Sequence, residues 1–280
     1  MSTPPITIGV LALQGAFDEH IQHLKTASHH HSVNSTEFKF VEVRTAEQLA
    51  TCTALILPGG ESTTMSLIAE RNNLLEPLRQ YVKVERKPVW GTCAGLILLA
   101  ESATRTKKGG QELIGGLDVR VNRNFFGRQV ESFSADLDMP FLAANREESA
   151  APFHTVFIRA PVVEAILPRK SGVQIEEARK NDIIVAPSKE AKEDAPKEAV
   201  EGEVEILARL PKRAHTIPMG KSGERDASAE EVGEQGDIVA VRQGNCFGTS
   251  FHPELTSDVR MHVWWLGEVV KAVRKSRGQA

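Results

Sequence analysis

The chain has 280 residues, of which 41% are hydrophobic and 25% are charged, and its formal net charge at pH 7 is -3. This is the composition of a globular protein that is long enough to bury a large core. The small net charge gives no general attraction to nucleic acid or to an anionic membrane, and we expect neither as a partner.

The chain has three cysteines, Cys52, Cys93 and Cys246. An odd and small number of cysteines is not typical of a disulfide framework, so a reducing compartment is favoured. An apolar stretch near the start, residues 6–13, has no basic residues before it and is too short to span a bilayer. We therefore expect a cytoplasmic protein.

The first hundred residues alternate between short apolar runs and amphipathic segments. The runs predict strands over residues 6–13, 39–45, 53–60 and 87–93, and the amphipathic segments predict helices over 17–27, 46–52, 61–82 and 94–102. This alternation is typical of an α/β fold in which helices flank a central, mostly parallel sheet. In such sheets, sites lie at the carboxyl ends of the strands.

The second half is predicted to be rich in strands over 156–161 and 237–255, and a closing helix is predicted over 258–275. Residues 177–203 and 212–236 are dense in charge, Ala, Pro and Gly, and we expect two flexible surface insertions there, with a strand at 204–210 between them. The prediction is a single domain over residues 1–280. Three adjacent histidines at 29–31 do not converge on one ion in a helix or strand, so no metal site is assigned.

Cys93 lies in the segment Gly91-Thr92-Cys93-Ala94-Gly95, directly after a predicted strand. This G-x-C-x-G pattern is the cysteine counterpart of the nucleophile elbow, a tight turn from strand to helix that needs small flanking residues. A thiol at a helix N-terminus is favoured as thiolate. On this motif alone, a buried packing cysteine and a catalytic cysteine remain equally open.

A nucleophilic thiol needs a base, and the segment Ser250-Phe251-His252-Pro253-Glu254 offers one. Pro253 favours an extended His252, which would place His252 and Glu254 on one face so that the carboxylate orients the imidazole. A structural histidine next to an acid is the alternative for this segment by itself. Together with the cysteine motif, it favours a Cys93-His252-Glu254 triad.

The turn Leu57-Pro58-Gly59-Gly60-Glu61-Ser62 allows backbone amides to approach a ligand closely. Acyl transfer through a thiol needs donors for the developing oxyanion, and the Gly60 and Ala94 amides are the candidates.

These motifs resemble those of the triad glutamine amidotransferases, in which a thiolate attacks the side-chain amide of glutamine. More narrowly, VLALQGAFDEH, LILPGGESTTM, VWGTCAGLILLA, VNRNFFGRQVESF, VFIRAP and SFHPELT are similar to the glutaminase subunits of pyridoxal 5'-phosphate synthase, in order from residue 6 to about 267. The resemblance implies that Cys93 is the nucleophile, that His252 transfers protons and that Glu254 orients it. It also implies glutamine-binding residues, namely Gly60, Glu61, Ser62, Arg123, Ile158 and Arg159.

The resemblance further implies a partner, a synthase subunit of TIM-barrel type that uses the ammonia to build pyridoxal 5'-phosphate, and L-glutamine as substrate. It implies no cofactor and no metal in this chain. Asn122 stands where glutamate is common in the family, the charged insertions depart from the compact family pattern, and Gln14-Gly15 matches without an assigned role.

Three other hypotheses stay open at this point. One is a cysteine peptidase or a related hydrolase on a similar fold, which the glutamine-specific motifs argue against. Another is an amidotransferase that serves a different synthase. The third is a non-catalytic subunit that keeps the fold for assembly.

Overall fold

The computed structural model describes residues 4–30, 33, 36–104, 111–123, 125, 132–143, 151–170, 172–188, 202–211 and 236–278. In chain order the elements up to residue 122 are β1 (Ile6–Leu11), α1 (Phe17–Ser28), β2 (Phe38–Val43), α2 (Ala46–Ala50), β3 (Ala54–Leu57), α3 (Ser62–Arg71), α4 (Leu75–Arg79), η1 (Gln80–Val84), β4 (Val89–Thr92), α5 (Ala94–Leu99), β5 (Ala100–Thr104) and β6 (Leu117–Asn122). They are followed by β7 (Ser132–Leu137), η2 (Pro140–Leu142), β8 (Phe153–Ile158), β9 (Val162–Ile166), α6 (Ile175–Ala178), β10 (Ile183–Val185), β11 (Glu205–Leu210), β12 (Asp237–Gln243), β13 (Cys246–Thr249), η4 (Pro253–Leu255) and α9 (Arg260–Ser276).

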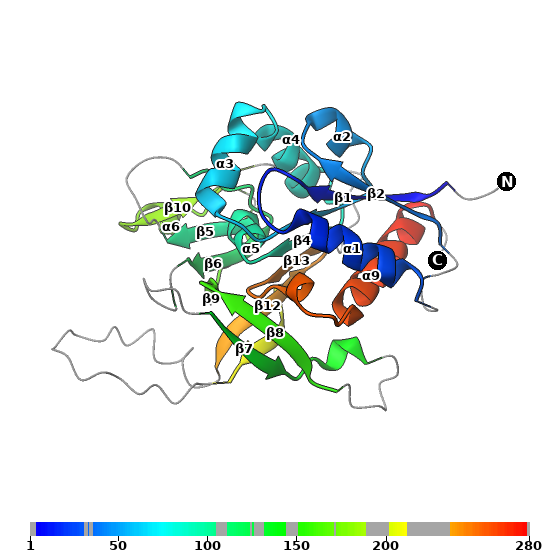
Figure 1. Cartoon of the computed structure of the whole chain (residues 1–280). Coiled ribbons are helices and arrows are strands. Elements are labelled where there is room, and N and C mark those ends of the chain that lie inside the picture. Colours follow the sequence, from blue (N-terminus) through cyan, green and yellow to red (C-terminus); the bar gives the residue numbers. More distant parts are fainter. Residues whose placement is uncertain are drawn as a thin grey trace.

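One large sheet runs through the molecule in the order β10-β5-β6-β9-β12-β13-β4-β3-β1-β2, and β11 pairs with β12 beside this path (Figure 1). The half from β13 to β2 is parallel throughout. Beyond β13 the sheet is mixed, because β12 and β9 run antiparallel to their neighbours. The expected α/β fold is confirmed, and the parallel half carries the candidate site.

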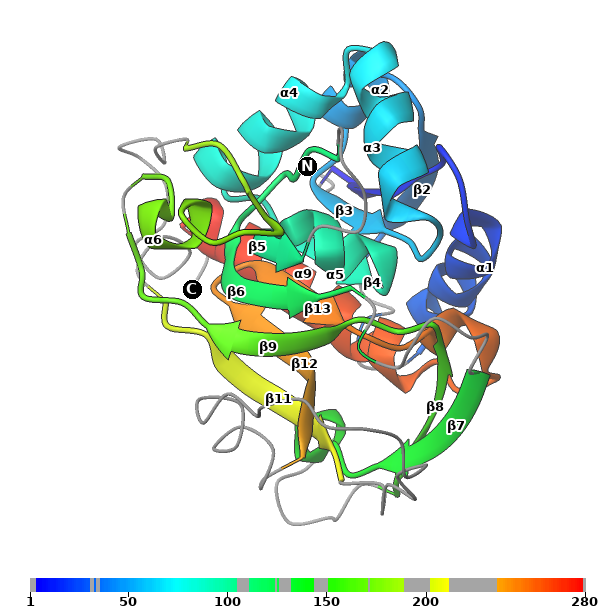
Figure 2. The same cartoon turned by 90° about the vertical axis from the view of Figure 1, so that its left-hand side faces the viewer.

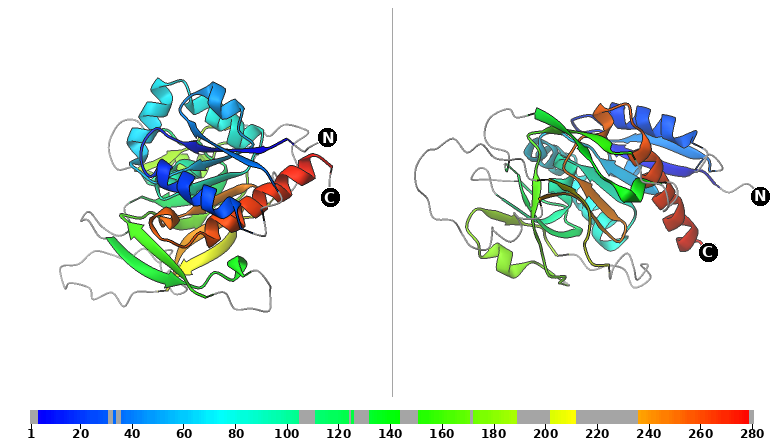
Figure 3. Two further views of the ribbon diagram at one scale, coloured as in Figure 1. Left: turned by 45° about the vertical axis from the view of Figure 1, so that its right-hand side comes forward. Right: turned by 90° about the horizontal axis from the view of Figure 1, so that it is seen from below.

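Helices cover both faces of this parallel half, because its strands are apolar on both sides. On one face α1 and α9 lie side by side, as the left view of Figure 3 shows. Their apolar residues share a core with Ile8, Ile56 and Trp90 of the strands. On the other face α2 to α5 cover Leu55, Leu57 and Val89. Consecutive strand residues thus enter opposite cores, as the two-residue period of a strand requires.

Two predicted helices differ from the structure. The helix expected over 61–82 is interrupted between α3 and α4, where Asn73 takes a φ of 53°, a left-handed conformation that Asn tolerates better than most residues. The helix expected over 94–102 ends at Leu99, because Ala100 is extended and begins β5, which pairs with β6. Apolar residues alone do not distinguish a buried helix from a buried strand.

The strand expected at 204–210 is confirmed as β11. The first charged interval, 177–203, contains β10, an edge strand that pairs antiparallel with β5. Lys83 forms a buried ion pair with Glu101 of β5 (2.7 Å) and also donates a hydrogen bond to the Pro187 carbonyl. These contacts connect the segment that follows β10 to the rest of the sheet. Residues 189–201 and 212–235 lie outside the described residues.

The short sheet of β7 and β8 is separate from the large one and lies at the far end of the molecule from α2 and α4 (Figure 2). It matters for the site because the backbone amide of His252 donates to the Val156 carbonyl of β8. Within the described part of the chain, no helix has the length and apolar character needed to cross a membrane.

Candidate active site

Cys93 occupies the turn between β4 and α5, at the carboxyl end of a central parallel strand. Its φ of 48° and ψ of -102° are unusual for a residue with a side chain, and its amide donates to the Thr249 carbonyl of β13 at 2.8 Å. Such strained conformations cluster at functional sites. The elbow predicted from the G-x-C-x-G pattern is therefore present, with Cys93 at its apex.

The two glycines of the pattern are required by close backbone approach. A methyl group on Gly91 would collide with the backbone of Gly95, and one on Gly95 would collide with the Leu57 carbonyl of β3. The turn can be this tight only because neither position carries a side chain. Ala94 opens α5, so its amide belongs to the first turn, in which backbone donors have no partner within the helix.

His252 and Glu254 meet as expected, with 2.7 Å between His252 Nδ1 and Glu254 Oε1. The backbone that brings them together differs from the expected extended one, because Pro253–Leu255 forms a 3-10 turn. Both side chains are buried. This turn directs the Glu254 carboxylate back toward the His252 ring.

The electrostatics of this pair favour a charged imidazolium. Burial opposes the charge, but interactions with the side chains of Cys93 and Glu254 outweigh it and raise the pKa of His252 to about 10. Burial likewise opposes ionisation of Glu254, yet His20 and His252 keep the pKa of this carboxyl below its usual value. Cys93, His252 and Glu254 therefore form one connected group.

The Pro58-Gly59-Gly60 turn lies directly against the histidine. A methyl group on Gly59 would collide with Cε1 of the His252 ring. The turn is held by Gln14, whose side-chain oxygen accepts from the amide of Glu61 at 2.8 Å, and by Gly15, whose φ of 91° brings it against the Gly59 carbonyl. Gln14 and Gly15, which had no assigned role, thus support the candidate oxyanion turn.

Glu61 and Arg123 come close to each other, with 3.9 Å between Glu61 Oε1 and an Arg123 guanidinium nitrogen. Glu61 caps α3 by accepting from the amides of Thr63 and Thr64. Partial burial opposes its ionisation, but the hydrogen bonds from Thr64 and Thr63 lower the pKa of Glu61. The predicted ammonium-binding carboxylate is therefore also a helix cap.

Arg123 is buried and donates to the hydroxyls of Ser62 (2.9 Å) and Thr63 (3.0 Å). Burial lowers the pKa of its guanidinium, and Glu61 partly offsets this. Ser62, Glu61 and Arg123 are thus brought together at the start of α3, as expected. Most of the segment that follows, NFFGRQV at 124–130, lies outside the described residues, which include only Phe125 of it.

Ile158 and Arg159 end β8 beside the cysteine. The thiol of Cys93 lies 3.9 Å from the Ile158 carbonyl, and Arg159 has a φ of 44°. The backbone of this pair therefore faces the thiol, whereas the Arg159 side chain is exposed.

Two residues next to the group were not singled out from the sequence. His20 of α1 lies 3.3 Å from Glu254 Oε2, and His262 of α9 lies 3.0 Å from His20. Both histidines lie in segments that the sequence predicts as amphipathic helices. The helical pattern does not indicate which polar residue of such a segment is buried. Cys52 and Cys246, by contrast, are core residues as expected.

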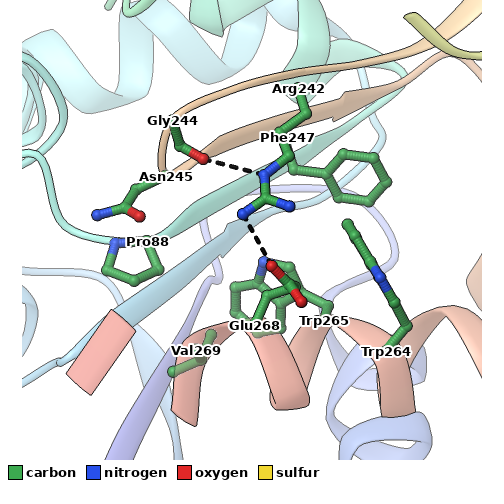
Figure 4. A pocket seen from close by; sticks show the side chains of 9 residues that line it. All are labelled: Pro88, Arg242, Gly244, Asn245, Phe247, Trp264, Trp265, Glu268 and Val269. Atoms are coloured by element: carbon green, nitrogen blue, oxygen red, sulfur yellow. Dashed lines mark hydrogen bonds and ion pairs between the residues drawn. The ribbon is translucent and has the colours of Figure 1, made fainter. Parts of the chain in front are cut away.

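A separate small pocket lies at the opposite, amino ends of β4 and β13 (Figure 4). Its lining includes Arg242, which pairs with Glu268 at 2.8 Å, and the ring of Trp264. Because Arg242 and Glu268 neutralise each other, we assign no catalytic or binding role to this pocket. Among the residues that the structure describes, no cluster of His, Cys, Asp and Glu has the makings of a metal site.

The model of the SNO glutamine amidotransferase family matches residues 10–193 and 212–271 of the chain, a span that includes every residue of the site described above. The chain belongs to this glutamine amidotransferase family.

Relatives of the same family agree over most of the chain. A probable pyridoxal 5'-phosphate synthase subunit PDX2 of Arabidopsis thaliana is 41% identical over 93% of this chain and 85% of its own length. The pyridoxal 5'-phosphate synthase subunit PdxT of Herpetosiphon aurantiacus is 37% identical over 94% of this chain and 100% of its own. A crystal structure described as a glutamine amidotransferase superposes with a TM-score of 0.60 at 35% identity, covering 94% of this chain and 98% of that one.

Proposed function

We propose that this amidotransferase is the glutaminase subunit of a pyridoxal 5'-phosphate synthase, which hydrolyses L-glutamine to L-glutamate and ammonia for vitamin B6 biosynthesis. The observation that carries the catalytic part is the position of Cys93 on a strained elbow, within interaction range of a His252 ring that Glu254 holds at 2.7 Å. The names of the relatives support the synthase part.

In the first half of the reaction, the Cys93 thiolate attacks the carbon of the glutamine side-chain amide. The imidazolium of His252 then gives its proton to the departing nitrogen, so that ammonia leaves and a glutamyl thioester remains. A His252 pKa of about 10 keeps this proton available at neutral pH, and Glu254 fixes which ring nitrogen faces the thiol.

In the second half, a water molecule attacks the thioester carbon, and the now neutral His252 takes its proton. The bond to sulfur breaks, glutamate leaves and the thiolate-imidazolium pair is restored. Both steps pass through an oxyanion, for which the Gly60 and Ala94 amides are the proposed donors, each worth about 10²–10³ in rate.

The substrate would lie between α3 and the end of β8. Arg123 supplies a cation for the α-carboxylate, and Glu61 supplies an anion for the α-ammonium. The family resemblance assigns four further residues to glutamine binding, namely Gly60, Ser62, Ile158 and Arg159. The closeness of Glu61 to Arg123, 3.9 Å, suits the two opposite charges of an amino acid.

Ammonia is useful only if it reaches an acceptor before it escapes to solvent, so the proposed partner is the TIM-barrel synthase subunit that the sequence resemblance implies. The three free, buried cysteines fit a reducing compartment, and we place the enzyme in the cytoplasm.

The deciding experiment measures glutamate release from glutamine by the chain, with and without the synthase subunit. Cys93→Ala should abolish release, whereas Cys52→Ala, at a buried cysteine in the core, should retain it. Release that persists in Cys93→Ala would exclude the proposed nucleophile.

The same assay separates the other hypotheses. Release that only a different synthase stimulates would indicate another amidotransferase, and no release from the wild-type complex would indicate a non-catalytic subunit. Cleavage of peptides in preference to glutamine would indicate a peptidase.

A further inference from the structure

A buried chain of polar side chains continues behind the proposed triad. His20 of α1 is fully buried, and its Nε2 lies 3.3 Å from Glu254 Oε2 and 3.3 Å from the Thr92 hydroxyl. Its Nδ1 lies 3.0 Å from Nε2 of His262, which is also fully buried. Trp90 packs against both imidazole rings, with centroid distances of 5.7 and 5.0 Å. Residues from both ends of the chain thus meet behind the carboxylate.

Burial favours the neutral form of both histidines. Burial lowers the pKa of His20, although Glu254 offsets part of this effect, and burial lowers the pKa of His262 well below its usual value. The charged or titratable side chains that act on this pair are Glu19 and His23 on α1, together with His252 and Glu254. Each ring therefore carries one N–H, and the question is which nitrogen bears it.

The contacts decide the position of each proton. Nδ1 of His262 is buried with no hydrogen-bond partner among the described residues. A proton there would be an unsatisfied donor, and His262 Nε2 would have to accept from His20 Nδ1. His20 would then turn a bare Nε2 toward the Glu254 carboxylate, so that two acceptors would face each other.

The opposite arrangement satisfies every nitrogen except the bare Nδ1 of His262. His262 donates through Nε2 to Nδ1 of His20, and His20 then carries its proton on Nε2, which faces Glu254 Oε2. The other carboxylate oxygen, Oε1, already accepts from His252. Glu254 Oε2 is buried and has no hydrogen-bond partner among the described residues. His20 Nε2, which also contacts the Thr92 hydroxyl, lies 3.3 Å from this oxygen, so a small rotation of the ring would bring its N–H onto the carboxylate.

We propose that His20 is a positioning residue for glutamine hydrolysis: with its tautomer set by His262, it presents Nε2–H to Glu254 at 3.3 Å and keeps that carboxylate aligned on His252. This inference rests on the proposed triad. A buried carboxylate without a second partner tends to take up a proton. A protonated Glu254 would no longer support the His252 imidazolium, so the acidic limb of the pH-rate profile would lie at higher pH.

The test compares His20→Leu with His20→Gln, whose amide keeps a donor at the position of Nε2. The matched control is His29→Leu, at an exposed histidine that follows the last residue of the same helix, α1. Two quantities are measured for each full-length protein. They are KM for glutamine in the complex with the synthase subunit, and the pH dependence of kcat in the same complex.

His20→Leu should lower kcat about tenfold with little change in KM, and should move the acidic limb of the kcat profile upward by about one pH unit, because Glu254 takes up a proton more readily. His20→Gln should recover most of both effects, and His29→Leu should show neither. His262→Phe, which removes the donor to His20, should shift the acidic limb in the same direction as His20→Leu.

The inference is overturned if His20→Leu leaves the acidic limb of the kcat profile at the wild-type pH, or if His20→Gln is as impaired as His20→Leu. These outcomes differ from a failure of the proposed function, in which the wild-type complex itself would release no glutamate.

Discussion

At the scale of single residues, the site depends on glycines that leave room for neighbouring groups. Gly59 faces the ring of His252, and Gly15 faces the Gly59 carbonyl. Gly59→Ala should therefore displace the His252 ring and lower kcat/KM about 10²-fold, because misplacement by about 1 Å can have an effect of this size. A Gly59→Ala enzyme with wild-type kcat/KM would show that the ring does not depend on this turn.

The charge on His252 leads to a prediction on pH. Its pKa is raised to about 10, so the imidazolium persists at neutral pH and is lost as the pH rises through about 10. Glu254→Gln removes the carboxylate that helps to raise this pKa, so the alkaline limb of kcat/KM should move to lower pH. The measurement is a pH-rate profile of the complex from pH 6 to about 10.5.

The control for this profile is Glu268→Gln, whose carboxylate pairs with Arg242 at the opposite ends of the strands. It should keep the wild-type alkaline limb. If Glu254→Gln also kept it, the carboxylate would not be the group that supports the imidazolium.

At the scale of elements, the contact of α5 with β3 fixes the direction in which Cys93 is presented. Gly95 touches the Leu57 carbonyl, so Gly95→Ala must push α5 away from the sheet, at a cost of about 1–3 kcal/mol. Gly267 in α9 is the matched control, since nothing lies within 4 Å of an added methyl group there. Gly267→Ala should stabilise the protein by about 0.5–1 kcal/mol, because alanine loses less backbone entropy than glycine in a helix.

Urea unfolding of the two glycine variants measures both effects, and glutaminase activity should fall only in Gly95→Ala. Equal unfolding midpoints for the two variants would contradict the packing argument.

At the scale of the whole molecule, the buried histidines set how stability depends on pH. His20 and His262 have folded pKa values below the unfolded value of about 6.5, so the unfolded chain binds more protons below that pH and stability falls as the pH falls. Each contributes at most about 1.4 kcal/mol per pH unit. His252 acts in the opposite sense, because its contribution is complete below about 6.5 and is lost as the pH rises through about 10.

We therefore expect maximal stability near pH 6.5, and a lower urea midpoint at pH 5 than at about pH 6.5. His262→Phe should reduce the difference between the two midpoints, because one buried neutral histidine is removed. Wild-type midpoints that agree at the two pH values would contradict this assignment of buried, neutral rings.

The sequence by itself determined the alternation of strands and helices in the first hundred residues, the elbow at Cys93 and the pairing of His252 with Glu254. These features are local: each depends on the period of the apolar residues or on residue types within a few positions of one another. For the same reason, the sequence did not determine where α5 ends and β5 begins, since an apolar run satisfies both structures.

Only the tertiary structure decided which distant residues join the site. Gln14 meets Glu61, and His20 meets both Glu254 and His262. These contacts join elements separated by up to 242 positions in the chain. They arise because the sheet order places β1, β3, β4 and β13 side by side, so that the segments following these strands meet at one edge. The order of the strands in the sheet cannot be predicted from any local sequence pattern.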